Sequence, residues 1–253
     1  MLSAAFRVGL LLALQDLKQA YRRSILGQAW ITLGMLVLIG SIAAVFGLIL
    51  GVNLQEYLPY VASGIIVYSL ISGLMNEGSH GFIAAETMIK QSNVPMFAHH
   101  IRVVLRVSFT FLHNLVIFPL VFFITGNLFS INVLLVLPGL ILLIVAIGGI
   151  SLSLGILSAR YRDVPPIVQA VMTVGFYVTP VIWSAEQIGN ASLAHTLLGL
   201  NPLYHLIQVV RLPLIGTYPT LTNWGLAAAA AIAGAAVGVI SLARTKSKIV
   251  LWV

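Results

Sequence analysis

Long apolar stretches, separated by shorter polar ones, dominate the chain. A helix needs about 20 apolar residues to cross a bilayer, and six stretches reach that length. We therefore predict transmembrane helices over residues 29–51, 58–78, 103–125, 133–158, 167–183 and 224–243. The stretch 58–78 is the least apolar of them, because three serines and Asn76 interrupt it.

Residues 1–28 precede the first apolar stretch and contain the most polar run of the sequence. On a helix, apolar positions fall on one side: Phe6, Leu10, Leu14, Leu17, Tyr21 and Ile25. Lys18, Arg22 and Arg23 fall on the other side. This pattern predicts an amphipathic helix on the membrane surface, with its cations towards anionic headgroups.

Two connecting segments are longer than simple turns. Residues 79–102 mix charged and apolar positions between the second and third stretches. Residues 184–223 are too polar near their start, and too broken by Pro202 and Pro213, to span. Their two apolar runs have the length of re-entrant or interfacial helices.

The composition indicates an integral membrane protein of all-α class. Hydrophobic residues make up 60% of the chain and charged residues 8%, with a mean hydropathy of +1.06. The net charge of +7 does not indicate nucleic-acid binding, because the cations lie at membrane edges rather than on a soluble basic face. Cysteine is absent, and the histidines lack metal-ligand spacing, so we expect no metal.

The cations also predict an orientation. With six spans, all of the 13 Lys and Arg except Arg211 fall on one side. By the positive-inside rule that side is cytoplasmic. We therefore expect a multi-pass protein of the cytoplasmic (inner) membrane, with both termini and residues 79–102 in the cytoplasm.

Three short motifs occur in order along the chain. Residues 16–30 read D-L-K-Q-A-Y-R-R-S-I-L-G-Q-A-W and residues 159–164 read A-R-Y-R-D-V. Residues 177–181 read Y-V-T-P-V and are followed by N-P-L at 201–203 and by Arg211. Together with the six-span pattern, they make the chain resemble the ABC-2 type permeases that export polysaccharides. One departure is Gly34, where many members carry a proline.

The resemblance implies a single transmembrane domain over residues 1–253 that works as a homodimer with two ATP-binding subunits. Its implied substrate is a polyprenyl-linked polysaccharide, such as O-antigen of lipopolysaccharide biosynthesis, capsule or teichoic acid precursors. An ABC-2 permease for a lipid or a drug is the alternative. No lysine follows a glycine, so the chain has no P-loop. We expect no catalytic residue and no cofactor here, with ATP and Mg²⁺ on the partner subunit.

The resemblance also implies a coupling helix in the segment 79–102, which would contact the ATPase. The candidate coupling residues are Glu86, Lys90, Val94, Pro95, Met96 and Phe97. The alternative is a loop that simply lies on lipid.

Five cations are candidates for holding a lipid headgroup: Lys18, Arg22, Arg23, Arg160 and Arg162. The alternative is that they only anchor the topology on anionic membrane lipid. We further expect an arginine of the 160–163 turn to pair with Asp163.

Six aromatic residues are candidates for a glycan path, because sugar rings present flat C–H faces to aromatic rings. They are Tyr57, Tyr60, Tyr68, Phe176, Tyr177 and Trp183. The alternative is the interfacial aromatic belt, which we favour for Tyr57, Tyr60 and Trp183. Tyr68 and Tyr177 lie deeper and suit a channel or packing role.

Two other function classes fit the sequence less well. A proton-driven transporter usually shows a two-fold repeat and buried charges, and neither is visible. An intramembrane transferase needs clustered acids or a nucleophile, whereas the six acids of this chain are dispersed.

Overall fold

The chain folds into a bundle of helices. The computed structural model describes residues 2–20, 22, 26–27, 29–92, 94–126, 130–185, 192–245 and 248–253. The first helices are α1 (Leu2–Ala20), α2 (Ala29–Leu50), α3 (Leu54–Ala84), α4 (Glu86–Gln91), α5 (Met96–Asn114) and α6 (Ile117–Thr125). The 3-10 helix η1 (Ile131–Leu135), α7 (Val136–Arg160), α8 (Val164–Val178), α9 (Ser192–Leu200), α10 (Pro202–Leu214), α11 (Leu221–Thr245) and α12 (Ile249–Trp252) follow. The described residues contain no strand, which confirms the predicted all-α class.

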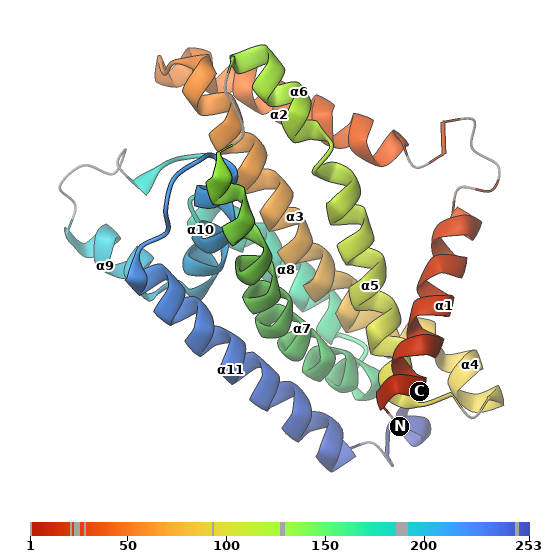
Figure 1. Ribbon diagram of the computed structural model, residues 1–253. Helices are drawn as coiled ribbons and strands as arrows, with labels where there is room; N and C mark the ends of the chain where they lie inside the picture. The colour runs from red at the N-terminus through yellow and green to blue at the C-terminus, as the bar shows by residue number, and fades with distance from the viewer. Residues whose placement is uncertain are drawn as a thin grey trace.

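Helix α3 is the centre of the bundle, and α2, α5, α6, α7, α8 and α10 all contact it (Figure 1). Its start is fixed by Asn53, whose side chain accepts a hydrogen bond from the Gln55 backbone at 3.0 Å. Its Ile66, Leu70 and Leu74 are almost fully buried. The serines that interrupt its apolar pattern therefore lie on a helix that other helices surround.

Helices α7 and α11 pack at very short range through small residues. A Cβ built on Gly234 would lie 2.1 Å from the Ala146 carbonyl oxygen, and one on Gly149 would lie 2.1 Å from the Gly234 oxygen. Small residues let two backbones approach this closely, which increases dispersion contact where the hydrophobic effect offers little. The pair is the most extensive helix contact of the bundle.

Helix α1 lies along α5 through a second stripe of small residues, Ala5, Gly9 and Ala13, which are buried. A Cβ on Gly9 would lie 2.9 Å from the Ala98 carbonyl oxygen. Members of the apolar side that the sequence predicted face outward, with Phe6 51% and Leu14 40% exposed. Two of its predicted members, Tyr21 and Ile25, lie outside the described residues.

Among the described residues, five helical stretches are long and apolar enough to cross a membrane. They are Ala29–Ile49, Leu54–Ala84, Met96–Thr125, Ile131–Arg160 and Leu221–Thr245. Helix α8, at the place of the fifth predicted span, has 15 residues. Helix α2 crosses the end of α3 at a steep angle and exposes most of its apolar side chains (Figure 1).

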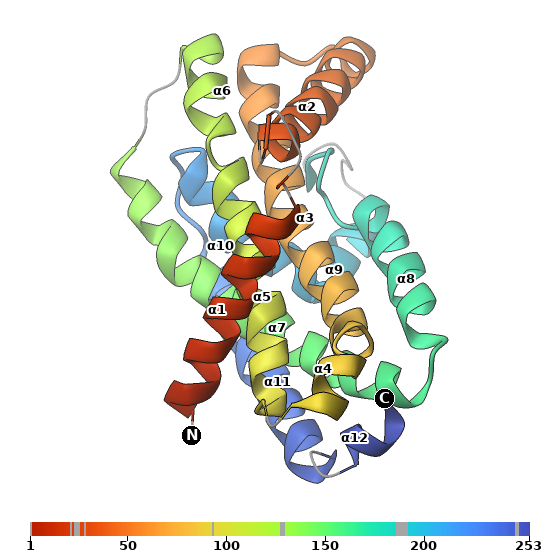
Figure 2. The same cartoon turned by 90° about the vertical axis from the view of Figure 1, so that its right-hand side faces the viewer.

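Both chain ends, α4 and α12 gather at one end of the bundle, which we call the terminal end (Figure 2). A small separate core stabilises this end. It joins Phe82 of α3, Ile89 of α4, Leu152 of α7, and Ile249 and Val253 of the last residues. The coupling segment predicted from the sequence therefore has an apolar anchor in the bundle.

We expect Gly234→Ala to destabilise the protein by about 1–3 kcal/mol, because the added Cβ pushes α11 away from Ala146. Thermal unfolding in detergent measures this change. Gly225→Ala on the same helix is the control, since nothing lies within 4 Å of its Cβ position. Equal melting temperatures for the two variants would contradict the close α7–α11 contact.

Candidate functional site

A non-helical segment follows α8, and side chains satisfy its backbone. Arg211 donates to the carbonyl oxygens of Pro180 at 2.7 Å and Val181 at 2.8 Å. The hydroxyl of Tyr57 donates to the Ile182 oxygen at 2.7 Å, and that of Tyr60 to the Trp183 oxygen at 2.9 Å. We call residues 180–183 the capped segment. Because lipid offers no hydrogen bonds, four consecutive capped carbonyls let irregular backbone lie inside the bundle.

Arg211 holds this arrangement from α10 and is fully buried. Its guanidinium lies 4.2 Å from the centre of the Tyr60 ring and donates to the Tyr60 hydroxyl at 2.8 Å. It forms no ion pair within the described part of the chain, so carbonyl dipoles and a π face balance its charge. Gly64 makes room for it, since a Cβ there would lie 2.0 Å from Nη2.

The T-P-V motif, which overlaps this segment, is in direct contact with the N-P-L motif that follows it in the sequence. The Asn201 side chain donates to the Thr179 hydroxyl at 3.0 Å. Its oxygen also accepts from the Leu203 backbone at 3.0 Å and so caps the start of α10. The T-P-V motif, the N-P-L motif and Arg211 therefore form one hydrogen-bonded cluster.

A groove of about 380 Å³ runs between α2, α3 and α8. Five polar side chains line it: Ser69, Ser72, Asn76, Gln169 and Thr173. Gln169 and Thr173 are exposed on α8. Polar groups at this depth of a membrane protein normally face protein, water or a polar ligand rather than lipid.

Three aromatic rings form one wall of the groove. The Tyr68 and Phe176 rings lie 5.3 Å apart, edge to face, and so do Phe176 and Tyr177. The Tyr68 hydroxyl donates to the Met172 carbonyl oxygen, which ties α3 to α8. Tyr177 is 65% exposed and presents its ring outward.

The six predicted aromatic residues thus form two groups. Tyr68, Phe176 and Tyr177 line the groove, whereas the hydroxyls of Tyr57 and Tyr60 are engaged by the capped segment. Trp183 joins the groups, because its indole donates to the Tyr177 carbonyl oxygen at 3.1 Å.

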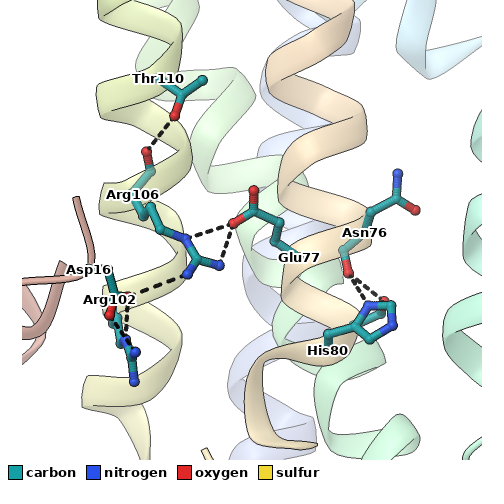
Figure 3. Close-up of polar contacts among 8 residues, drawn as sticks. Asp16, Asn76, Glu77, His80, Arg102, Arg106 and Thr110 are labelled. Carbon is teal, nitrogen blue, oxygen red and sulfur yellow. Dashed lines mark hydrogen bonds and ion pairs between the residues drawn. The ribbon is translucent and has the colours of Figure 1, made fainter. Parts of the chain in front are cut away.

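An ion-pair network joins three helices near the terminal end (Figure 3). Arg102 donates to both oxygens of Asp16, at 2.6 and 2.5 Å. Arg106 donates twice to Glu77, at 2.9 and 2.6 Å, and also contacts Asp16 at 3.4 Å. The network fixes α1 and α3 to α5. Sequence reasoning missed it, although the spacing of the two arginines places them on one face of a helix.

Glu86, in the predicted coupling segment (residues 79–102), forms two ion pairs. Lys90 donates to Glu86 at 2.7 Å, and Arg162 approaches the other Glu86 oxygen at 3.6 Å. The hydrogen bond and charge of Lys90 lower the pKa of Glu86. The structure therefore joins a predicted coupling residue to a predicted headgroup residue.

The expected pairing within the 160–163 turn is wrong. Arg162 reaches Glu86, and Arg160 lies over the rings of Tyr161 at 5.1 Å and Trp252 at 5.4 Å. Asp163 forms no ion pair with any described residue. Glu86, which is distant in sequence, therefore takes the place of the expected neighbour as the partner of Arg162.

The remaining predicted residues lie around the start of α5 and near the end of α1. Pro95 precedes α5, while Met96 and Phe97 begin it and pack on the small core. Val94 is half-buried in the link before them. Lys18 and Arg22 are exposed at the end of α1, and Arg23 lies outside the described residues.

The fold and the groove define a helical membrane protein with a polar path beside its central helix. Residues 9–215 match the family model of the ABC-2 type transporter. The chain therefore belongs to the ABC-2 transporter family, as the motifs predicted. Two O-antigen export system permease proteins RfbA of Klebsiella pneumoniae are 23% and 24% identical over 180 residues. These matches cover 69% of this chain and 68% of each relative.

We expect Arg211→Met to destabilise the protein strongly. It leaves the Pro180 and Val181 carbonyls unpaired in the bundle, and each such group costs about 1–3 kcal/mol. Thermal unfolding in detergent checks the loss. Arg244→Met is the matched control, because Arg244 is exposed at the end of α11. A melting temperature of the Arg211 variant equal to that of the control would refute the capping role.

Proposed function

We propose that this chain is the permease subunit of an ABC transporter that exports lipid-linked polysaccharide, specifically O-antigen, across the inner membrane. The family and the RfbA relatives support export by a permease. The observation that carries the choice of substrate is the groove between α2, α3 and α8.

The groove has the two kinds of surface that a glycan needs. The exposed ring of Tyr177 suits the C–H face of a sugar, and the Gln169 and Thr173 side chains offer hydrogen bonds to hydroxyls. A permease for a lipid or a drug, the alternative, needs a more apolar lining. A polyprenyl-linked polysaccharide is therefore the substrate that we favour.

The groove is open on one side, which supports a homodimer. Of its own lining, Leu38 of α2 is 47% exposed and Tyr177 of α8 is 65% exposed. A lone bundle leaves the polar lining of the groove facing lipid. A second copy placed against α2 and α8 closes the path and buries these side chains.

We infer six spans, with α8 as the fifth. Its 15 residues extend about 22 Å at 1.5 Å per residue, short of the ~30 Å hydrocarbon core. The capped segment supplies the missing length with its carbonyls satisfied. Helices α9 and α10 then fold back as re-entrant helices on the outer side, and α1 packs along the first half of α5 with Phe6 and Leu14 towards lipid.

The terminal end is the cytoplasmic side in this proposal. Lys90, Arg160, Arg162, Arg244 and Lys248 lie at helix ends there, whereas Arg211 belongs to α10. Two ATP-binding subunits dock at this end, bind ATP and Mg²⁺, and contact α4. The ion pair of Glu86 with Arg162 connects α4 to the turn between α7 and α8.

The proposal is tested by purifying this chain together with its ATP-binding subunit. The purified complex, reconstituted in vesicles, should move a fluorescent polyprenyl-linked glycan into the lumen only with ATP. A phospholipid or drug probe should not compete with it. Failure of the two proteins to form a complex, or transport of the lipid or drug in place of the glycan, would overturn it.

We expect the double variant Gln169→Leu and Thr173→Val to lower glycan export about tenfold, equivalent to ~1.4 kcal/mol, while ATP hydrolysis continues. It removes hydrogen-bonding groups from the groove and adds only apolar surface. Gln169→Asn, which keeps the amide, is the control. Undiminished export by the double variant would remove the groove from the glycan path.

We expect Glu86→Lys to separate ATP hydrolysis from export. The new cation faces Lys90 and Arg162, so α4 loses both ion pairs. The ratio of glycan exported to ATP hydrolysed should fall severalfold. The exchange of both charges, Glu86→Lys with Lys90→Glu, keeps the pair within α4 and should restore part of the ratio. An unchanged ratio in Glu86→Lys argues against coupling through α4.

A further inference from the structure

A second cavity, of about 300 Å³, lies at the terminal end between α3 and α5. Its polar lining comes from Asn76, Glu77, His80, His99, Arg102 and Arg106. Figure 3 shows all of these except His99, around the ion-pair network. None of the six is among the cations that the sequence assigned to a lipid headgroup.

His99 is the feature of this cavity that calls for a ligand. Its side chain is 1% exposed, and neither ring nitrogen has a hydrogen-bond partner in the described part of the chain. A neutral imidazole carries one N–H donor and one acceptor, and a buried polar group without a partner is costly. His99 borders the cavity, so a rotation of its covered imidazole towards this space would let a polar ligand supply the missing partner.

The two arginines present unused donors to the same cavity. A guanidinium has five N–H groups, and the contacts within the described residues use two of Arg102 and three of Arg106. Asp16 and Glu77 hold both guanidinium groups in place. Groups that are already fixed lose less entropy when they bind a ligand.

The donors are best matched by an anion with several acceptor oxygens. Asp16 lies behind Arg102 and does not line the cavity, so two cations and one carboxylate face it. Arginine binds phosphate through paired N–H groups, and the imidazole adds a further donor. The described residues contain no group of three acidic or histidine side chains able to hold a metal ion, so a cation site is not indicated.

We propose that this cavity binds a phosphate group, held by Arg102, Arg106 and His99 between α3 and α5. The phosphate belongs to a membrane lipid headgroup or to a soluble phosphate compound. This site goes beyond the proposed function and does not depend on it, because it requires neither an exported glycan nor an ATPase partner.

The test uses the full chain purified in a neutral maltoside detergent. Bound phosphatidic acid is counted by native mass spectrometry, with diacylglycerol as the probe that lacks phosphate. Inorganic pyrophosphate is tested separately by its effect on the melting temperature. Binding of phosphatidic acid alone identifies a lipid phosphate, and binding of both identifies a site that accepts free phosphate as well. Both results support the site.

The deciding variant is His99→Leu. It removes an unpartnered polar group, so the melting temperature without ligand should stay equal or rise, whereas phosphate affinity should fall at least tenfold. His100→Leu is the matched control, because His100 lies in a separate apolar groove with Gly148 and Val104. Arg102→Lys keeps a cation near Asp16 but loses the paired geometry, and should weaken binding in the same way.

Two results would overturn the proposal. One is the absence of binding by phosphatidic acid and by pyrophosphate to the unmodified chain. The other is binding that His99→Leu and Arg102→Lys leave unchanged relative to His100→Leu. Loss of glycan export with intact phosphate binding would instead concern only the proposed function.

Discussion

Backbone groups buried away from water need hydrogen-bond partners, and the capped segment shows how this molecule supplies them. Four carbonyls in a row accept from Arg211, Tyr57 and Tyr60, which belong to α10 and α3. The central helix, the end of α8 and the helices after it are joined at this point. Without these donors the backbone after α8 needs water or a regular helix to satisfy its carbonyl groups.

The chain uses arginine in two different ways. Arg211 has no carboxylate partner within the described residues, and its charge is spread over carbonyl dipoles and the Tyr60 ring. Arg102 and Arg106 are instead paired with Asp16 and Glu77. The first arrangement fixes a backbone conformation, whereas the second fixes helices and keeps N–H groups available. The two arrangements differ in burial, because Arg211 is fully buried whereas Arg102 and Arg106 border a cavity.

The sequence predicted the helical membrane class, the family and the approximate positions of most helices, because apolar length and ordered motifs are local signals. It did not predict the close α7–α11 contact at Gly234 and Gly149, since many glycines of a membrane helix look alike until two helices meet. The predicted pairing of an arginine of the 160–163 turn with Asp163 was wrong for the same reason. Glu86 is distant in sequence from Arg162, and only the fold brings its carboxylate within 3.6 Å of the guanidinium.

Asn76 lines both the groove beside α8 and the cavity beside α5, and its side-chain oxygen has no partner in the described structure. One residue of α3 therefore borders both spaces. An amide carries an acceptor oxygen and a donor NH₂ group on different sides, so this one side chain offers hydrogen bonds in two directions. A flip of this amide exchanges its acceptor and its donor, and it therefore changes the polarity of one wall of the groove and of the cavity together.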